Sequence, residues 1–169
     1  MQENHSSSHS PGSLVALRHA IWPYILCLVW GIWWGGLCFY AVVVVPIGTE
    51  LIGSVEQGFI TQQVTQWHNA LSILAVLCLC IEAGRRQSRL LWGTGAILAI
   101  VVVCEFVWHI HLTALMDFQD QSVPEHFYGA HAIYLWMTAV EWGIGLLLPV
   151  YFFASGAEQM KSVESESTQ

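Results

Sequence analysis

The sequence predicts an all-α integral membrane protein, an antiparallel four-helix transmembrane bundle with both termini in the cytoplasm. Three observations predict this class: 10% of the 169 residues are charged, 55% are hydrophobic, and the mean hydropathy is +0.54. An ordinary soluble domain has about 25% charged residues. The apolar residues also gather into four runs, each close to the roughly 20 residues that a helix needs to cross the hydrocarbon core. The net charge of −7 argues against a nucleic-acid-binding protein, which needs a basic surface.

The four runs have recognisable ends. Pro46 closes the first run, Gly84 and Arg85 end the second, and Ser155 and Gly156 follow the fourth. Proline, glycine and charged residues are typical of the ends of membrane helices, because the first two interrupt the helix and the third favours water. The expected spans are therefore residues 21–45, 66–83, 90–112 and 130–153.

Two polar segments flank this membrane domain of residues 19–155. Residues 1–18 form an N-terminal tail, expected to be disordered because it contains few large apolar residues, and residues 156–169 form an acidic C-terminal tail. The first apolar run is longer than the apolar region of a cleaved signal peptide and lacks a small-residue cleavage site after it. We therefore interpret it as an uncleaved anchor.

The charged residues predict the orientation. Positively charged loops stay on the cytoplasmic side of a membrane. All five cations lie before the first span, between the second and third, or after the fourth: Arg18, Arg85, Arg86, Arg89 and Lys161. The other two loops carry acids only: Glu50, Glu56, Asp117, Asp120 and Glu125. The expected location is the cell membrane, which is the inner membrane in a Gram-negative bacterium, and the expected partner is its lipid.

Small residues predict how the helices pack. Gly31 and Gly35 are four residues apart in the first span, and such pairs let helix backbones approach closely in lipid. We favour contacts within the bundle; the alternative is that this face binds a second copy of the chain or another membrane protein. Similar small residues occur in the third and fourth spans at Gly93, Gly95, Gly143 and Gly145.

The fourth span carries a polar stripe. His131, Tyr134, Thr138 and Glu141 follow one another at three or four residues, which places them on one helix face. Glu141 lies in the middle of the expected span, where a carboxyl group is costly and is by default a functional candidate. The alternative is that a protonated Glu141 forms hydrogen bonds with Trp, Tyr or Ser across the bundle.

A metal or haem site is one interpretation of the histidines. His68, His109 and His131 lie within about three residues of the outer ends of their expected spans, so they share a level at which three helices could converge. Glu105 lies one turn deeper than His109. Three imidazoles and a carboxylate suit copper, zinc or iron, and two facing imidazoles suit haem. The alternative is that these histidines are interfacial or hydrogen-bonded within the bundle.

Three segments resemble the transmembrane protein 205-like family. They are the Gly35–Pro46 segment, with its Gly-Gly pair, aromatics and valines, the Phe127–His131 segment followed by Tyr134-Leu135-Trp136, and the Gln57–His68 stretch in the place of a loop into the second span. Pro46, Phe127 and His131 match residue by residue. The resemblance implies a four-helix membrane domain of undefined biochemical role.

The expected function is non-enzymatic. The sequence contains no phosphate-binding loop, nucleophile elbow, paired metalloprotease histidines or dinucleotide fingerprint. We expect a membrane protein that binds or moves a small solute or metal ion through the His/Glu cluster near the outer face. The alternatives are a b-type haem electron carrier and a ligand-free structural or assembly protein.

Overall fold

The structure is a computed structural model that describes residues 11–167, with side chains over residues 21–151. The described residues are helical apart from short connections and the loop over residues 116–126, which confirms the all-α part of the prediction. Four segments are long and apolar enough to cross a membrane: residues 21–52, 54–86, 89–115 and 127–151. The helices are α1 (Pro11–Phe39), the π-helix η1 (Tyr40–Val44), α2 (Val45–Ile52), α3 (Ser54–Arg86), α4 (Arg89–Leu115) and α5 (Phe127–Ser167).

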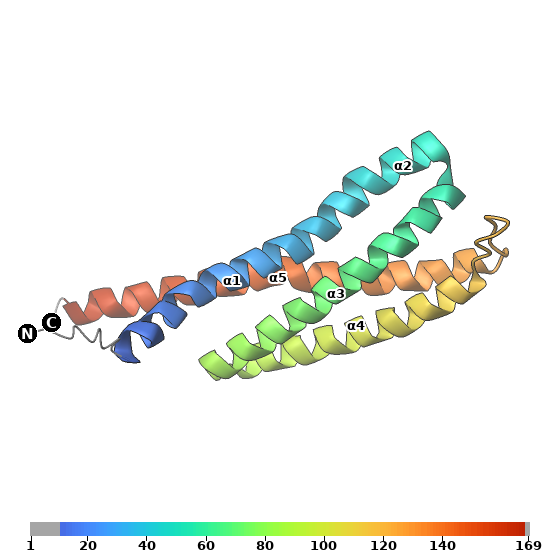
Figure 1. The fold of residues 1–169 in the computed structure, drawn as a ribbon. Coiled ribbons are helices and arrows are strands. Elements are labelled where there is room, and N and C mark those ends of the chain that lie inside the picture. The colour runs from blue at the N-terminus through green and yellow to red at the C-terminus, as the bar shows by residue number, and fades with distance from the viewer. Residues whose placement is uncertain (1–10, 168–169) are drawn as a thin grey trace, which may run out of the picture.

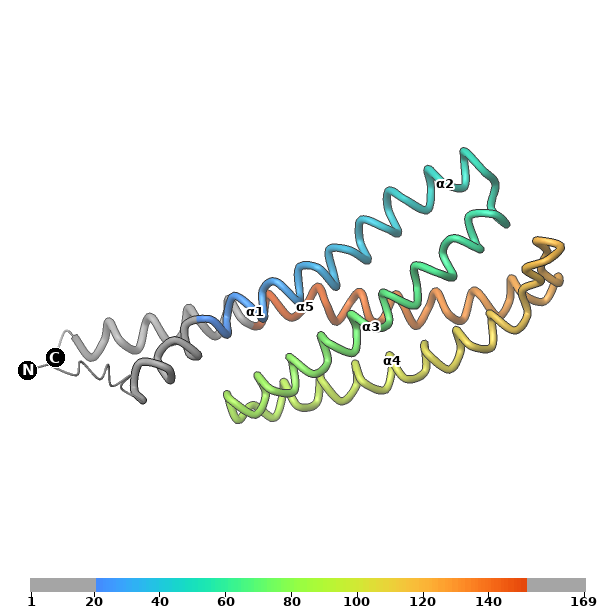
Figure 2. Tube along the Cα trace, viewed as in Figure 1, coloured from blue at the N-terminus to red at the C-terminus, as the bar shows by residue number. Residues whose placement is uncertain are grey.

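The helices pack side by side along their lengths. α3 lies between α1 and α4, and α5 packs against α4 and α1 (Figure 1). The α2–α3 and α4–α5 connections lie at one end of the bundle, which we call the acidic end. The α3–α4 connection lies at the other end, where Ser88 Oγ is 3.1 Å from Tyr151 Oη of α5. α1, η1 and α2 form an almost continuous helical rod. This rod diverges from α5 toward the acidic end (Figure 2). Within the described residues, α2 packs against α3 and not α5.

α3 is longer than the sequence predicts. It begins at Ser54, twelve residues before the expected start of the second span, so the loop expected over residues 57–68 is helical. The polar residues of this stretch favour a loop in the sequence. Two of its four glutamines, however, are buried between helices: Gln57 faces α2 and η1, and Gln62 Nε2 donates to Thr113 Oγ1 of α4 at 3.2 Å.

The terminal segments also extend the helices. Residues 11–18 of the expected N-terminal tail belong to α1, and the expected C-terminal tail belongs to α5 as far as Ser167. The rest of the expected N-terminal tail, residues 1–10, lies outside the described residues.

Pro46 does not end the first membrane helix. Because proline has no N–H, the carbonyl of Val42 has no donor four residues ahead, and the helix widens into η1, in which Val45 N–H bonds to Tyr40 O. The chain then continues as α2 to Ile52 and turns at Gly53, whose φ of +98° suits glycine. Tyr40 Oη lies 3.0 Å from Thr61 Oγ1, so the widened turn is fixed to α3.

The glycine prediction is half correct. Gly95 packs against Leu79 and Cys80, and a side chain on Gly145 would overlap the Trp34 ring, so both glycines do serve contacts within the bundle. Gly31 and Gly35 do not. No described side chain lies within 4 Å of the place where their Cβ atoms would stand. The reason is that α1 contacts its neighbours through tryptophans on another face. Four indole nitrogens on α1 donate to α3 or α5: those of Trp22, Trp30, Trp33 and Trp34.

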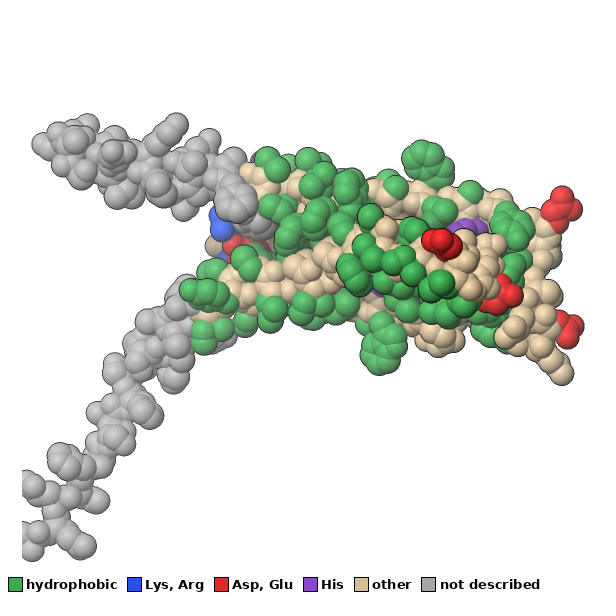
Figure 3. All heavy atoms as spheres, turned by 90° about the horizontal axis from the view of Figure 1, so that it is seen from above, with side chains coloured by type: hydrophobic (Ala, Val, Ile, Leu, Met, Phe, Trp, Pro, Cys, Tyr) green, Lys and Arg blue, Asp and Glu red, His purple; other side chains and the backbone are tan. Residues whose placement is uncertain are grey.

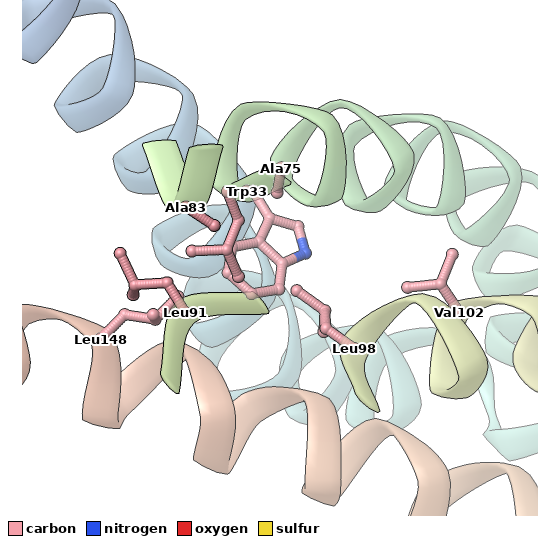
Figure 4. Packing of buried hydrophobic residues seen from close by; sticks show 8 residues of the cluster. Trp33, Ala75, Ala83, Leu91, Leu98, Val102 and Leu148 are labelled. Atoms are coloured by element: carbon pink, nitrogen blue, oxygen red, sulfur yellow. The ribbon is translucent and has the colours of Figure 1, made fainter. Parts of the chain in front are cut away.

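An apolar core fills one half of the bundle, and lipid-compatible surface surrounds it. Trp33 is fully buried at the centre of the core cluster (Figure 4). The rest of that cluster comes from α3, α4 and α5: Ala75, Leu79, Ala83, Leu91, Leu98, Val102 and Leu148. Outside, apolar side chains cover the helices, whereas acidic side chains gather at the acidic end (Figure 3). This distribution suits contact with a lipid bilayer.

Candidate functional site

A buried polar group lies at the border of the apolar core. We call it the carboxyl centre: Glu105, Glu141, Trp33, Ser72 and His68. Glu141 Oε1 accepts a hydrogen bond from Trp33 Nε1 at 2.8 Å and lies 2.6 Å from Ser72 Oγ. Glu105, Glu141, Ser72 and Trp33 are all fully buried. The hydrogen bonds that the sequence offered as an alternative for Glu141, with Trp and Ser across the bundle, are therefore present.

The two glutamates face each other. Glu105 of α4 interacts with Glu141 and with Thr138, both of α5. Neither carboxyl oxygen of Glu105 has a hydrogen-bond partner, and Glu141 Oε2 has none either. Leaving such atoms unpaired in a dry interior costs about 1–3 kcal/mol each. Two carboxyl groups that face each other also repel each other when both are charged. The arrangement is therefore unfavourable without a proton or another bound species.

The length of α3 explains why His68 belongs to this centre. His68 lies fourteen residues after the first residue of α3, and Glu141 lies fourteen residues after the first residue of α5. Both helices begin at the acidic end, so both side chains are about 21 Å along their helix from it. Glu141 and the backbone of Trp33 are the neighbours of His68. His68 Nε2 is buried without a partner.

A polar layer continues from the carboxyl centre toward the acidic end. Tyr134 is buried, with Glu105, Glu141 and Thr138 as neighbours, and its ring centroid lies 6.4 Å from that of His109. Thr138 Oγ1 donates to Tyr134 O at 3.1 Å. Three of the four residues in the predicted α5 stripe, Tyr134, Thr138 and Glu141, thus lie on the face that their spacing indicated. That face meets Glu105 and His109 of α4.

An outer pocket adjoins this layer. It has a volume of about 540 Å³ and lies between α3 and α4, lined by Gln66, Asn69, Phe106, His109, Ile110, Thr113 and Ala114. Asn69 and His109 are more than nine-tenths buried, at 3% and 8% exposed. Both polar atoms of the Asn69 amide and His109 Nε2 have no partner among the described atoms. Unpaired buried donors and acceptors beside a cavity of this size are the usual setting for ordered water or a small polar ligand.

The expected convergence of His68, His109 and His131 is not present. Among residues 21–151, no group of three or more His, Cys, Asp or Glu side chains is placed to hold a metal ion. His68 lies deeper than the sequence indicated, beside Glu141. His131 is half-buried near the acidic end and stacks on Phe127, with ring centroids 5.7 Å apart. His68 does not share the level of His109 and His131 because α3 begins at Ser54, twelve residues before the expected start of the second span.

Sequence reasoning missed a third buried acid, Glu82. Its carboxylate accepts a hydrogen bond from Trp22 Nε1 at 2.7 Å and pairs with Arg86, and Arg85 lies 3.5 Å away. The Arg85 guanidinium also stands over the Trp22 ring, 5.6 Å from its centroid. The signal was available, because an acid three and four residues before two arginines is a helical ion-pair pattern.

An inner cavity of about 350 Å³ extends from Glu82 to Trp33. α1 contributes one face of its helix to the lining, α3 the opposite wall, and α4 and α5 the base. Its lining includes three indoles, a thiol and two charged side chains: Trp22, Trp30, Trp33, Cys78, Glu82 and Arg86. The remaining lining is apolar apart from the Cys27 thiol.

The comparisons with known proteins do not assign this arrangement. No family model matches the chain, and no significant match occurs among curated proteins or solved structures. The resemblance to the transmembrane protein 205-like family stays a prediction.

Proposed function

We propose that this membrane protein binds protons at the carboxyl centre and uses them to bind or move a small solute or cation. The observation that carries the proposal is the meeting of two fully buried glutamates, Glu105 and Glu141, from different helices. An ionisable side chain inside a membrane is costly and persists when function needs it. A proton shared by the pair relieves the repulsion, and a cation would do the same.

The hydrogen bonds around Glu141 support two protonation states. Ser72 Oγ lies 2.6 Å from Glu141 Oε1 and 3.0 Å from His68 O, but a hydroxyl has only one proton to donate. When Glu141 is charged, Ser72 donates to it. When Glu141 carries a proton on Oε1, Glu141 donates to Ser72 Oγ and Ser72 donates to His68 O. In both patterns Glu141 Oε1 and the Ser72 hydroxyl are hydrogen-bonded to each other without a change of rotamer.

Access to the centre is favoured from the acidic end. Polar side chains line the way from the outer pocket inward: Asn69, His109 and Tyr134 lie between the pocket and Glu105. On the other side the apolar core, with Trp33 at its centre, separates the glutamates from Glu82. This asymmetry is typical of a half-open pathway, in which a polar vestibule ends at a protonatable group.

The orientation we propose is antiparallel, with both termini in the cytoplasm and the acidic end outside. Arg85, Arg86 and Arg89 at the α3–α4 connection support it through the positive-inside rule. Single cysteines at Asp120 and at Arg89, each in a background without other cysteines, should react with an impermeant thiol reagent from opposite sides of intact cells. Labelling of both from one side would overturn the topology.

Carbodiimide labelling tests the protonated pair. Dicyclohexylcarbodiimide is apolar and modifies carboxyl groups that carry a proton, so the full chain in native membranes should be labelled on Glu105 or Glu141. Labelling should fall as the pH rises and the pair loses its proton. The matched control is Glu82, also buried, which should stay unlabelled because its carboxylate is ion-paired with Arg86 and close to Arg85. Equal labelling at all three acids, or none at the pair, would contradict the proposal.

Proton movement is tested separately in vesicles. The purified chain, reconstituted in liposomes that contain a pH-sensitive dye, should admit protons under an imposed potential faster than its Glu141→Gln variant does. Glu82→Gln, which leaves the carboxyl centre intact, should behave as the wild type. A wild-type rate equal to that of Glu141→Gln would sink the transport part of the proposal while carbodiimide labelling still reports on proton binding.

The metal and haem interpretations have a direct test. Elemental analysis and a visible spectrum of protein purified from its own membrane, normalised to protein, distinguish copper, zinc or iron from haem. Stoichiometric metal that is lost in Glu105→Gln but retained in His131→Ala would replace the proton by a metal ion as the bound species.

A further inference from the structure

The outer pocket combines apolar walls with three unpaired polar atoms. Its volume of about 540 Å³ falls within the range of small-ligand sites. Phe106, Ile110 and Ala114 of α4 provide the apolar walls. The unpaired atoms are both polar atoms of the Asn69 amide and His109 Nε2, on side chains that are more than nine-tenths buried. A buried polar atom is costly while it has no partner, so a bound molecule that pairs with these three atoms gains free energy.

The other polar side chains of the lining have partners or face outward. Thr113 Oγ1 donates to His109 O at 2.8 Å and accepts from Gln62 Nε2 at 3.2 Å. Gln66 is exposed, so its amide can pair with water. The choice of ligand therefore falls to Asn69 and His109.

The charges around the pocket favour an uncharged ligand. The described residues of the lining include no lysine, arginine, aspartate or glutamate. The sequence also has no lysine or arginine between residues 19 and 84 or between residues 90 and 160, so an anion in the pocket would meet neither. An ammonium group has donors only and would leave Asn69 Nδ2 without an acceptor. A neutral molecule avoids both problems.

The amide of Asn69 restricts the chemistry further. Its oxygen accepts, its nitrogen donates, and both leave the same trigonal carbon. The matching ligand edge also has a donor and an acceptor on one trigonal carbon, as a carboxamide does, and the two edges form the paired hydrogen bonds typical of asparagine. The carboxamide keeps a second N–H and a second lone pair, one of which suits His109 Nε2 in either tautomer.

We infer that the outer pocket binds a small uncharged carboxamide, with its amide on Asn69 and His109 and its apolar body against Phe106 and Ile110. The inference rests on the proposed function in that it names the class of solute that the protein moves. His109 follows Glu105 by four residues on α4, so the bound amide lies one helical turn from the carboxyl centre. This places the solute and the proton on neighbouring side chains.

Fluorine NMR of the full chain in lipid nanodiscs tests the inference with three probes of one shape. 4-Fluorobenzamide has the required edge, 4-fluoroacetophenone has a methyl group in place of the amide nitrogen, and 4-fluorobenzoate is an anion. Empty nanodiscs measure the partition of each probe into lipid. We expect saturable binding of 4-fluorobenzamide and about tenfold weaker binding of the other two, because neither has an N–H for Asn69 Oδ1.

Asn69→Leu tests the amide directly. It removes the donor and the acceptor at similar volume, so the preference for 4-fluorobenzamide over 4-fluoroacetophenone should disappear. The variant should fold, because it replaces a buried and unpaired amide by an apolar side chain. The matched control is Gln63→Leu on the exposed surface of α3, outside the described lining, which should keep the preference.

Thiol protection locates the probe in the pocket. In a chain without its own cysteines, Ala114→Cys places a thiol in the lining, and Val107→Cys places one on the exposed surface of α4. 4-Fluorobenzamide should slow the reaction of N-ethylmaleimide with the first thiol and not with the second.

Four results would overturn the inference: no saturable binding of 4-fluorobenzamide, equal binding of 4-fluoroacetophenone, a preference that survives Asn69→Leu, and an unchanged reaction rate at Ala114→Cys. Carbodiimide labelling separates this inference from the proposed function. Labelling of Glu105 or Glu141 without probe binding would remove the solute class alone. Probe binding without labelling would remove proton binding and leave the ligand class of the pocket.

Discussion

Trp33 Nε1 lies 2.8 Å from Glu141 Oε1 and 3.0 Å from Ser72 Oγ, so one indole proton joins α1 to both α3 and α5. In lipid, apolar surface gives little drive for helices to associate, and hydrogen bonds and close packing replace it. α1 relies on hydrogen bonds. Its tryptophans donate to two carboxyl groups, a hydroxyl and two backbone carbonyls of neighbouring helices: Glu82, Glu141, Ser72, and the oxygens of Trp142 and Gly145.

Trp33→Phe should therefore destabilise the bundle more than its small loss of volume implies. The phenyl ring fills most of the same space but donates nothing, so Glu141 and Ser72 lose a buried donor. We expect a cost of about 2 kcal/mol in the free energy of unfolding, measured by detergent denaturation in mixed micelles. Trp92→Phe is the control, because Trp92 is half exposed on the lipid-facing surface. Equal costs for the two variants would contradict the role of the Trp33 donor.

Gly145→Ala should separate α1 from α5. A methyl group at this position overlaps the Trp34 ring, which is stacked on Trp142 and cannot withdraw without breaking its own bond to Trp142 O. Overpacking of this kind costs about 1–3 kcal/mol, to be measured as the shift in thermal unfolding in micelles. Gly143→Ala is the matched variant, two residues away on the same helix, where a methyl group meets open space. It should be neutral.

Pro149 and Trp30 should show coupled effects on stability. Pro149 has no N–H to bond Gly145 O, the carbonyl four residues before it, and Trp30 Nε1 bonds that oxygen instead at 3.1 Å. In the wild type, Trp30→Phe leaves the oxygen unpaired. In the Pro149→Ala background the restored N–H takes it over, so Trp30→Phe should cost about 1 kcal/mol less in a double-mutant cycle. Additive effects would mean that the indole bond does not replace the helix bond.

The existence of the four spans could be predicted because it depends on hydropathy alone, which any bilayer-crossing helix must satisfy. The length of α3 could not. Gln57 and Gln62 look like loop residues in the sequence, and only tertiary packing shows that they are buried hydrogen-bonding residues between helices. His68 therefore lies deeper in the bundle than its distance from residue 66 indicates, because α3 begins at Ser54.

The candidate site was predicted in part. The stripe spacing correctly placed Tyr134, Thr138 and Glu141 on one face, because helical periodicity fixes that relation within an element. The meeting of Glu105 with Glu141 could not be predicted, since it depends on how far α4 and α5 are rotated and shifted against each other. The same holds for Gly31 and Gly35, whose spacing suits packing but whose face points away from the bundle.

The loop at the acidic end carries a pH-sensitive turn. Asp117 Oδ1 accepts hydrogen bonds from Gln119 N at 2.9 Å and Asp120 N at 3.1 Å, which lowers the pKa of Asp117 below its ordinary value of 3.8. A carboxyl group with a lowered pKa stabilises the folded turn above its unfolded-state pKa, and this contribution is lost as the pH falls through the folded-state pKa. The amide chemical shifts of Gln119 and Asp120 should therefore titrate together with an inflection below pH 3.8 and lose that step in Asp117→Ala. An inflection above 3.8 would contradict the turn.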